Sequence, residues 1–267
     1  MQMTKVKPHV KPTKTIAIRG RKLGSESPLI CSPLVARTAQ QLLAEGRAVL
    51  AKRPDVVEWR VDYFQGIADT AAVVKAGRSL RKLLSGRPLI FTCRSAREGG
   101  QPTNLDSGAV ARLYDAVGAE GLVDFVDFEM GNASSIVSKV VDTAHQHDTR
   151  VILSYHNFKR TPGTKTLVGK FMKADRMGAD VAKVAVMPEN RLDVLALLAA
   201  TAQADAGTRI PLISMSMGPL GAVTRMVGGV FGSALSFAVG KGSSAPGQLP
   251  IADLRSVYEI IERTHRA

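Results

Sequence analysis

The strongest constraint on the fold is a regular alternation of strand-like and helix-like segments that runs from residue 28 to the end of the chain. Short apolar runs bounded by turn residues predict strands at 28–34, 56–62, 88–94, 125–130, 150–157, 180–188, 211–217 and 234–239. Apolar residues that recur every three or four positions predict helices at 39–50, 69–84, 107–119, 133–146, 164–178, 189–205, 221–229 and 250–265. Each strand is therefore followed by a helix, which is the pattern of parallel βαβ units.

Eight such units predict an α/β protein with a closed (β/α)₈ barrel, the TIM-barrel architecture. The alternative is an open, doubly wound sheet, which should carry a glycine-rich phosphate turn after an early strand. The sequence contains no such turn. The Gly/Ser-rich segment 240–248 follows the last strand and lacks the spacing of a nucleotide P-loop, so we expect a mobile loop over the barrel mouth.

The residues ahead of the first barrel strand form a separate feature. Thr15–Arg19 reads as a strand, is interrupted by Gly20 and Gly24, and is expected to pair with Pro28–Leu34 as a β-hairpin ahead of the main body. Residues 1–22 contain seven Lys or Arg and no acid, about half of the net charge of +13, so we expect residues 1–14 to be a basic, disordered arm. Since no low-complexity linker is present, residues 15–267 are expected to form a single barrel domain.

Composition excludes several classes of protein. No apolar run reaches the ~18 residues that cross a membrane, and the start of the chain does not resemble a secretory signal. Cys31 and Cys93 are too few and too far apart for a disulfide framework or a zinc site, and His145 and His147 face different ways on a predicted helix. We therefore expect a cytoplasmic protein without metal ligands. Its basic charge favours a small anionic substrate.

One predicted strand, Asp180–Pro188, carries a lysine in the middle of an apolar run. Alternation along the strand puts Val181, Lys183 and Ala185 on one face. Lysine is almost never fully buried without a reason, and burial disfavours the charged ammonium, so Lys183 is a candidate amine nucleophile towards carbonyl groups. The alternative is a lysine near a strand end whose ammonium reaches water.

Three further strands separate polar from apolar side chains by face. Their polar residues are Glu58, Arg60 and Asp62, then Asp127 and Glu129, then Ser154 and His156. Because helices cover the outer face of barrel strands, the polar sets are expected inside, near the carboxyl ends where barrel enzymes keep their chemistry. His156 ends the strand before the Lys183 strand, so it is a candidate acid/base.

Two arginines complete the candidate site. Arg94 ends a strand and precedes Glu98 by four residues, and Gly99 and Gly100 then allow the chain to bend; the alternative is an ordinary surface pair. Arg225 follows the strand at 211–217, and its guanidinium suits a carboxylate; the alternative is a surface arginine.

Taken together, these segments resemble the type I 3-dehydroquinate dehydratase family, the class that forms a Schiff base with its substrate. The matching segments occur in order and cover nearly the whole chain after residue 15: EWRVD (58–62), TCRSAREGG (92–100), SYHNF (154–158), the Lys183 strand, MSMGPLGAVTR (215–225) and SAPGQ (244–248). The basic arm at residues 1–14 lies outside this resemblance.

The resemblance implies a role for each matching residue. It implies that Lys183 forms the imine, that His156 is the general acid/base and that Glu98 orients His156. The implied substrate contacts are Ser32, Glu58, Arg60, Arg94, Arg225, Ser244 and Gln248, with Arg225 binding the carboxylate. The implied protein is a cytoplasmic, homodimeric lyase without metal or cofactor, which dehydrates 3-dehydroquinate to 3-dehydroshikimate in the shikimate pathway of chorismate and aromatic amino acid biosynthesis.

Two other classes of protein share part of this pattern. A class I aldolase on the same barrel would share the lysine, but it would normally carry phosphate-binding turns after the last two strands, where this chain has SAPGQ. A basic nucleic-acid-binding protein would show salt-sensitive binding that depends on residues 1–14. No aromatic stacking residues accompany that arm, so nucleic acid is not expected as a partner.

Overall fold

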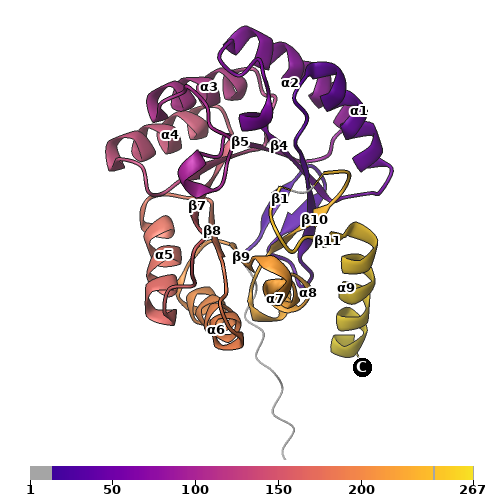
Figure 1. Cartoon of the computed structure of the whole chain (residues 1–267), viewed down its shortest axis with the longest axis vertical. Coiled ribbons are helices and arrows are strands. Elements are labelled where there is room, and N and C mark those ends of the chain that lie inside the picture. Colours follow the sequence, from indigo (N-terminus) through magenta and orange to yellow (C-terminus); the bar gives the residue numbers. More distant parts are fainter. Residues whose placement is uncertain (1–13, 243, 267) are drawn as a thin grey trace, which may run out of the picture.

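The computed structural model describes residues 14–242 and 244–266, and it contains the predicted barrel (Figure 1). The barrel strands are β3 (Leu29–Leu34), β4 (Val56–Arg60), β5 (Leu89–Thr92), β6 (Phe125–Glu129), β7 (Arg150–Asn157), β8 (Val181–Val186), β9 (Leu212–Ser216) and β10 (Leu235–Val239). They pair in parallel and in sequence order, and β10 pairs with β3. The ring closes where Ala234 N–H donates to the Leu212 carbonyl over 2.7 Å. The predicted fold class is therefore confirmed.

The helices surround the strands as an outer ring (Figure 1). They are α1 (Ala39–Leu50), α2 (Thr70–Leu84), α3 (Ser107–Ala119), α4 (Ser134–Gln146), α5 (Thr164–Arg176), α6 (Arg191–Gly207), α7 (Gly218–Gly221), α8 (Val223–Val227) and α9 (Ile251–Arg266). Single turns of 3₁₀ helix occur at η1 (Val61–Tyr63), η2 (Ala96–Glu98) and η3 (Gly228–Phe231), and a short strand, β11 (Leu249–Pro250), pairs with β10. None of the helices in the described ranges is long and apolar enough to cross a membrane.

The segment predicted as one short helix at 221–229 is divided into α7, α8 and η3. Gly221 lies directly against the backbone of Ser216, and the Thr224 hydroxyl accepts a hydrogen bond of 2.9 Å from Ser216 N–H. The segment is therefore folded back onto the end of β9 and does not extend as a single helix.

The N-terminal hairpin exists, but its predicted pairing was wrong. β1 (Ile16–Ile18) pairs antiparallel with β2 (Arg21–Leu23) and not with Pro28–Leu34, which is a barrel strand. Arg19 and Gly20 both have positive φ, 43° and 73°, so they form the tight two-residue turn that suits a hairpin. Residues 1–13 of the predicted arm lie outside the described residues. Lys14 is described, and its ammonium donates to the Thr208 hydroxyl over 3.0 Å.

The hairpin closes the amino-terminal end of the barrel. Ile18 and Leu23 line a small apolar cavity together with residues at the beginnings of the barrel strands, among them Val56, Ile90 and Phe125. The amino-terminal half of the barrel interior is therefore apolar and covered by the hairpin. The barrel is open at the carboxyl ends of the strands.

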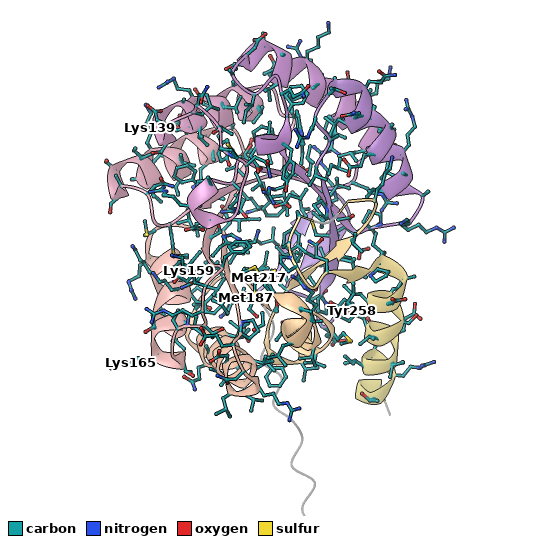
Figure 2. The ribbon with its side chains drawn as sticks, viewed as in Figure 1. Lys139, Lys159, Lys165, Met187, Met217 and Tyr258 are labelled. Carbon is teal, nitrogen blue, oxygen red and sulfur yellow. The ribbon has the colours of Figure 1, made fainter. Side chains whose placement is uncertain are left out.

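The two faces of the strands separate as predicted. Outward residues such as Trp59 and Phe91 pack against the helices, with their rings edge-to-face at 5.3 Å between centroids. Charged side chains such as Glu58, Asp127 and Lys183 are buried inside the barrel. Surface lysines such as Lys139 and Lys165 instead project from the outer ring of helices (Figure 2).

Candidate active site

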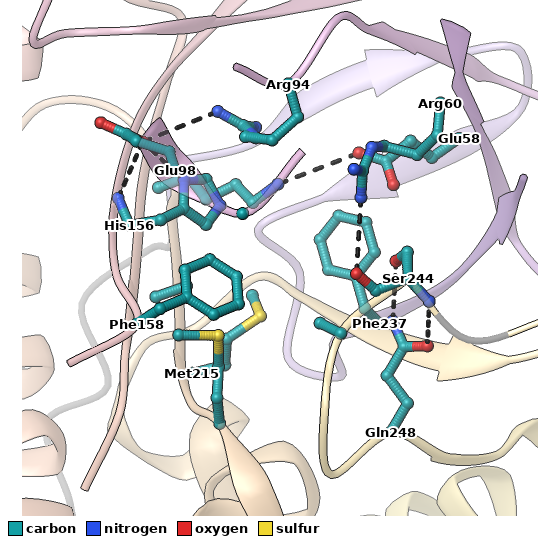
Figure 3. A pocket seen from close by; sticks show the side chains of 15 residues that line it. Glu58, Arg60, Arg94, Glu98, His156, Phe158, Met215, Phe237, Ser244 and Gln248 are labelled. Atoms are coloured by element: carbon teal, nitrogen blue, oxygen red, sulfur yellow. Dashed lines mark hydrogen bonds and ion pairs between the residues drawn. The ribbon is translucent and has the colours of Figure 1, made fainter. Parts of the chain in front are cut away.

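An open cavity lies at the carboxyl ends of the strands (Figure 3), and the space between its lining residues, open solvent included, is about 430 Å³. Its lining is polar on one side and apolar on the other, and consists of Glu58, Arg60, Arg94, Glu98, Gly99, His156, Phe158, Lys183, Ala185, Met215, Met217, Phe237, Ser244, Ala245 and Gln248. Strands far apart in the sequence thus bring most of the predicted site residues to one place.

Lys183 reaches the floor of this cavity from the middle of β8. Its Nζ donates to Asp127 Oδ2 over 2.8 Å, lies 3.9 Å from Glu58 Oε1 and stands 4.4 Å from the centroid of the Phe237 ring. The side chain is only 6% exposed, so the amine faces the cavity and not bulk water. An amine enclosed in this way can attack a carbonyl carbon, and the two carboxylates can stabilise a cationic product.

Asp127 connects Lys183 to Arg94. Asp127 Oδ1 accepts hydrogen bonds of 2.6 Å from Arg94 Nη2 and 2.6 Å from the Ser154 hydroxyl, and Arg94 Nη1 donates to Ser154 Oγ over 2.8 Å. Burial alone would raise the pKa of Asp127, but the charges of Arg94 and Lys183 hold that pKa well below its usual range. Asp127 is therefore a fixed negative charge beside the amine.

His156 and Glu98 form a second pair at the cavity wall. Glu98 Oε2 lies 2.9 Å from His156 Nδ1 and also accepts a hydrogen bond of 2.9 Å from the His156 backbone N–H (Figure 3). One carboxylate oxygen thus fixes both the ring and the backbone of His156. The Phe158 ring stacks at 22° to the imidazole, and a side chain at Gly99 would collide with Phe158.

The electrostatics of this pair favour a neutral imidazole. Burial lowers the pKa of His156 well below 6.5, and the neighbouring cations Arg94 and Lys183 lower it further. Burial raises the pKa of Glu98 from 4.5 to about 7; Arg94 opposes this rise and Glu129 adds to it. A neutral imidazole next to an ionisable carboxyl can accept a proton and return it near neutral pH.

Glu58 and Arg60 form the side of the cavity contributed by β4. The Thr92 hydroxyl donates to Glu58 Oε1 over 2.8 Å, and Arg60 makes two hydrogen bonds of 2.8 Å to the Asp62 carboxylate. Arg60 Nη1 also points towards the Ser244 carbonyl, at 3.5 Å (Figure 3). These contacts fix both side chains, which are almost fully buried, in the wall of the cavity.

The loop after β10 covers part of the opening. The Gln248 amide binds Ser244 twice: its Oε1 accepts from the Ser244 N–H and its Nε2 donates to Ser244 Oγ, both over 3.2 Å. Ser244, Ala245 and Gln248 all line the cavity, so the predicted position of this loop over the mouth is observed.

Two predicted residues do not line the cavity. Arg225 is 1% exposed, and its guanidinium donates to the carbonyls of Phe237 (3.3 Å) and Pro246 (3.1 Å) behind the wall formed by Met215 and the loop. Ser32 is fully buried on β3, and its hydroxyl has no hydrogen-bond partner among the described residues. Burial lowers the pKa of Arg225 to about 10.

Comparison with known proteins agrees with this geometry. The family model of type I 3-dehydroquinase matches residues 30–265. The chain belongs to the type I 3-dehydroquinase family. It is 49% identical over 252 residues to the 3-dehydroquinate dehydratase of Albidiferax ferrireducens, a match that covers 94% of this chain and 96% of the relative.

Solved structures of other type I 3-dehydroquinases superpose on the whole barrel. The 3-dehydroquinate dehydratase of Geobacillus kaustophilus has a TM-score of 0.92 at 43% identity, covering 94% of this chain and 97% of that one. The type I enzyme of Clostridium difficile has a TM-score of 0.91 at 33% identity, covering 95% and 100%. This type I 3-dehydroquinase is therefore a lyase, and the matches favour the dehydratase over the aldolase.

Several residues of this type I 3-dehydroquinase site were not assigned from the sequence. The most important is Asp127, which alternation places inside the barrel but whose contact with Lys183 depends on the pairing of β6, β7 and β8. Thr92, Ser154 and Phe237 also contact site residues. Their inward direction follows from alternation, but their partners lie on other strands and cannot be identified from spacing along one segment.

Proposed function

We propose that this type I 3-dehydroquinase converts 3-dehydroquinate to 3-dehydroshikimate through an imine on Lys183. The observation that carries the proposal is the Lys183 amine, buried at the floor of the cavity between the carboxylates of Asp127 and Glu58. Those two negative charges stabilise the cationic iminium that forms when the amine condenses with a ketone, because a buried site strengthens the attraction between unlike charges.

The reaction begins when the Lys183 ammonium releases one proton and the resulting amine attacks the ketone carbon; the carbinolamine oxygen then takes up one proton and leaves as water, which yields the iminium. The iminium withdraws electrons and acidifies the neighbouring C–H bond. His156 takes that proton, and the electron pair becomes an enamine. The enamine then expels the β-hydroxyl group, which receives a proton from the His156 imidazolium or from a water that it positions, and departs as water. Hydrolysis of the conjugated iminium releases the enone product and restores Lys183, so the net change is the loss of one water.

His156 suits both proton transfers because its pKa is lowered by burial and by the cations Arg94 and Lys183, so that the ring is neutral when the proton must be removed. Glu98 holds the imidazole through Nδ1, which leaves Nε2 to exchange protons with the substrate. General acid/base catalysis of this kind typically contributes ~10²–10⁴-fold to the rate.

Arg225 is proposed to bind the substrate carboxylate. In the part of the chain that the structure describes, its guanidinium forms no ion pair, although it is almost fully buried. A buried cation without a carboxylate partner is costly, and an anionic ligand that displaces the Pro246 carbonyl from Arg225 would supply the missing charge. The residues proposed to contact the hydroxyl and ketone groups of the substrate are Glu58, Arg60, Arg94, Ser244 and Gln248, which line the cavity. Ser32 does not line it and is proposed as a further contact because its buried hydroxyl has no hydrogen-bond partner among the described residues.

We also propose that the enzyme is a cytoplasmic homodimer, as the family resemblance implies. In size-exclusion chromatography with light scattering, a homodimer should have twice the mass of one chain. In cell fractionation, a cytoplasmic enzyme of the shikimate pathway should be recovered in the cytoplasmic fraction. The homodimer proposal fails if the mass in solution is that of one chain at micromolar concentration.

The decisive experiment combines product analysis with trapping. Purified enzyme mixed with 3-dehydroquinate should generate the absorbance of a conjugated enone, and borohydride added during turnover should attach the ligand covalently to Lys183, as located by peptide mapping. A class I aldolase would also be trapped by borohydride, but it would yield products of carbon–carbon cleavage. Label on another residue, or an active enzyme that borohydride never labels, would contradict the proposal.

A further inference from the structure

We propose that Glu129 is a positioning residue for the acid/base pair of Glu98 and His156, and that it acts through Ser95. The inference rests on the proposed function, because it assumes that His156 transfers the protons. Glu129 does not line the cavity, so any effect on catalysis must pass through other residues.

The first contact is between Glu129, at the end of β6, and Ser95, which follows β5. Ser95 N–H donates to Glu129 Oε1 over 2.8 Å, and the Ser95 hydroxyl donates to Oε2 over 2.6 Å. Both oxygens of one buried carboxylate therefore bind one residue, which fixes the direction in which the chain leaves β5.

The second contact runs from Ser95 to Glu98. The Ser95 carbonyl accepts hydrogen bonds from Glu98 N–H (3.0 Å) and from Gly100 N–H (2.8 Å), and so it closes the single turn η2. Gly100 lies so close to the Arg94 carbonyl that a side chain there would collide with it. The turn is thus held at its start by Glu129, and it presents Glu98 at its end to His156.

Charge provides a second route from Glu129 to Glu98. The charged or titratable groups around Glu98 are Arg94 after β5, Glu129 and Asp127 on β6, and His156 on β7. Burial raises the pKa of Glu98, Arg94 opposes the rise, and the negative charge of Glu129 adds to it. Arg94 already has Asp127 as its closest partner at 2.6 Å, against 3.4 Å to Glu129, so neutralising Arg94 does not require Glu129.

Two substitutions separate the hydrogen bonds from the charge. Ser95→Ala removes the hydroxyl bond but keeps the carboxylate, and we expect kcat to fall about tenfold, because misplacing an acid/base pair by a fraction of an ångström is costly. Ser95→Thr keeps a hydroxyl at the same position and should recover kcat to within about twofold of wild type.

Glu129→Gln keeps the shape and a hydrogen-bonding amide but removes the negative charge. We expect Glu98 to orient His156 as a carboxylate, so ionisation of Glu98 sets the acidic limb of the kcat/KM profile. Without the charge of Glu129 the pKa of Glu98 falls, and this limb should move to lower pH by about half a unit. The Ser95→Ala profile should keep the wild-type limb. A purely structural role would lower the melting temperature without moving this limb.

Matched controls are exposed residues of the same type. Glu120→Gln removes a surface carboxylate that pairs with Arg78, and Ser138→Ala removes a surface hydroxyl, so both should match wild type in every measurement. Activity is expressed per site that borohydride can trap, which corrects for unfolded protein. His156→Ala, assayed in parallel, tests the proposed function itself.

The outcomes distinguish the two proposals. If wild type does not dehydrate 3-dehydroquinate, or if His156→Ala is fully active, the proposed function fails. If wild type is active and His156→Ala is not, but the Ser95→Ala and Glu129→Gln variants keep both the kcat and the acidic limb of wild type, the positioning role of Glu129 is overturned. A second outcome would also overturn it: Glu129→Gln loses kcat but keeps the acidic limb of the wild-type kcat/KM profile, and Ser95→Thr does not recover the kcat that Ser95→Ala loses.

Discussion

The two buried arginines near the cavity, Arg94 and Arg225, have opposite surroundings. Arg94 lies among the carboxylates of Asp127, Glu129 and Glu98, and although burial alone would lower its pKa, these charges raise it above its usual value. The Arg225 guanidinium donates only to carbonyl oxygens and a methionine sulfur among the described residues, and burial lowers the pKa of Arg225 to about 10.

This difference separates two parts of the site, one on each side of the barrel. On the side of β5–β8, Arg94 and Lys183 both pair with Asp127, and His156 pairs with Glu98, so these groups are fixed before a substrate arrives. On the side of β9 and β10, the buried guanidinium of Arg225 has hydrogen bonds but no carboxylate partner among the described residues, so a bound anion could balance its charge. We infer that the first side sets kcat and that the second sets KM.

The largest expected effect is on the chemical side. His156→Ala should lower kcat by about 10²–10⁴-fold, because both proton transfers lose their acid/base, while KM changes little. Lys183 remains, so an imine can still form slowly and should accumulate as a species that borohydride traps. A stable variant with near wild-type kcat would refute the catalytic role, and a lower melting temperature with normal turnover would make His156 structural.

The second effect compares the stabilities of two matched variants. Arg94→Met leaves the buried carboxylates of Asp127 and Glu129 and the half-buried one of Glu98 short of a partner, and it should destabilise the protein by about 3–5 kcal/mol. Arg225→Met removes a buried cation that has no carboxylate partner in the ranges 14–242 and 244–266, so the free energy of unfolding should change by less than about 1 kcal/mol. Denaturant unfolding measures both. Equal destabilisation by the two substitutions would mean that Arg225 is compensated within the protein, and the contrast between the two sides would be lost.

The third effect is on substrate affinity. Arg225→Lys keeps the charge but loses the planar fork that binds a carboxylate through two hydrogen bonds, so KM should rise about tenfold with kcat within about threefold. The matched control is Arg209→Lys, at an exposed arginine that pairs with Asp175 on the surface. An unchanged KM for Arg225→Lys would place this residue outside the binding site.

The sequence was sufficient for those features that depend on local pattern. Alternation along single strands correctly put Glu58, Lys183 and His156 inside the barrel, because a parallel strand covered by helices has only two faces. The hairpin partner was missed because the turn uses a non-glycine residue, Arg19, at positive φ, which composition does not reveal.

Long-range contacts were beyond prediction for a different reason. Asp127 touches Lys183, Arg94 and Ser154, which come from three other segments, so its importance follows from the closed barrel and not from its own neighbours in sequence. Whether Arg225 has a carboxylate partner depends on all the segments packed around it. The spacing of residues along the chain does not show which charged groups come into contact.

The smallest effect concerns the pH dependence of stability, and it tests whether the Glu98–His156 pair is balanced as a unit. Burial raises the pKa of Glu98 from 4.5 to about 7, so between these values the folded protein holds a proton that the unfolded chain has released, and stability falls as pH rises. Burial lowers the pKa of His156 below 6.5, so below that value the unfolded chain holds the extra proton, and stability increases as pH rises.

These two slopes oppose each other in the wild type. Glu98→Gln leaves only the His156 contribution, so its stability should increase more steeply than that of wild type from about pH 5 to 6.5, by up to about 1 kcal/mol per pH unit. His156→Gln leaves only the Glu98 contribution, so its stability should decrease between about pH 5 and 7 relative to wild type. Urea unfolding at half-unit steps of pH measures all three proteins. Three parallel profiles would show that neither group changes its protonation on folding, and the neutral imidazole that the mechanism requires would then need another explanation.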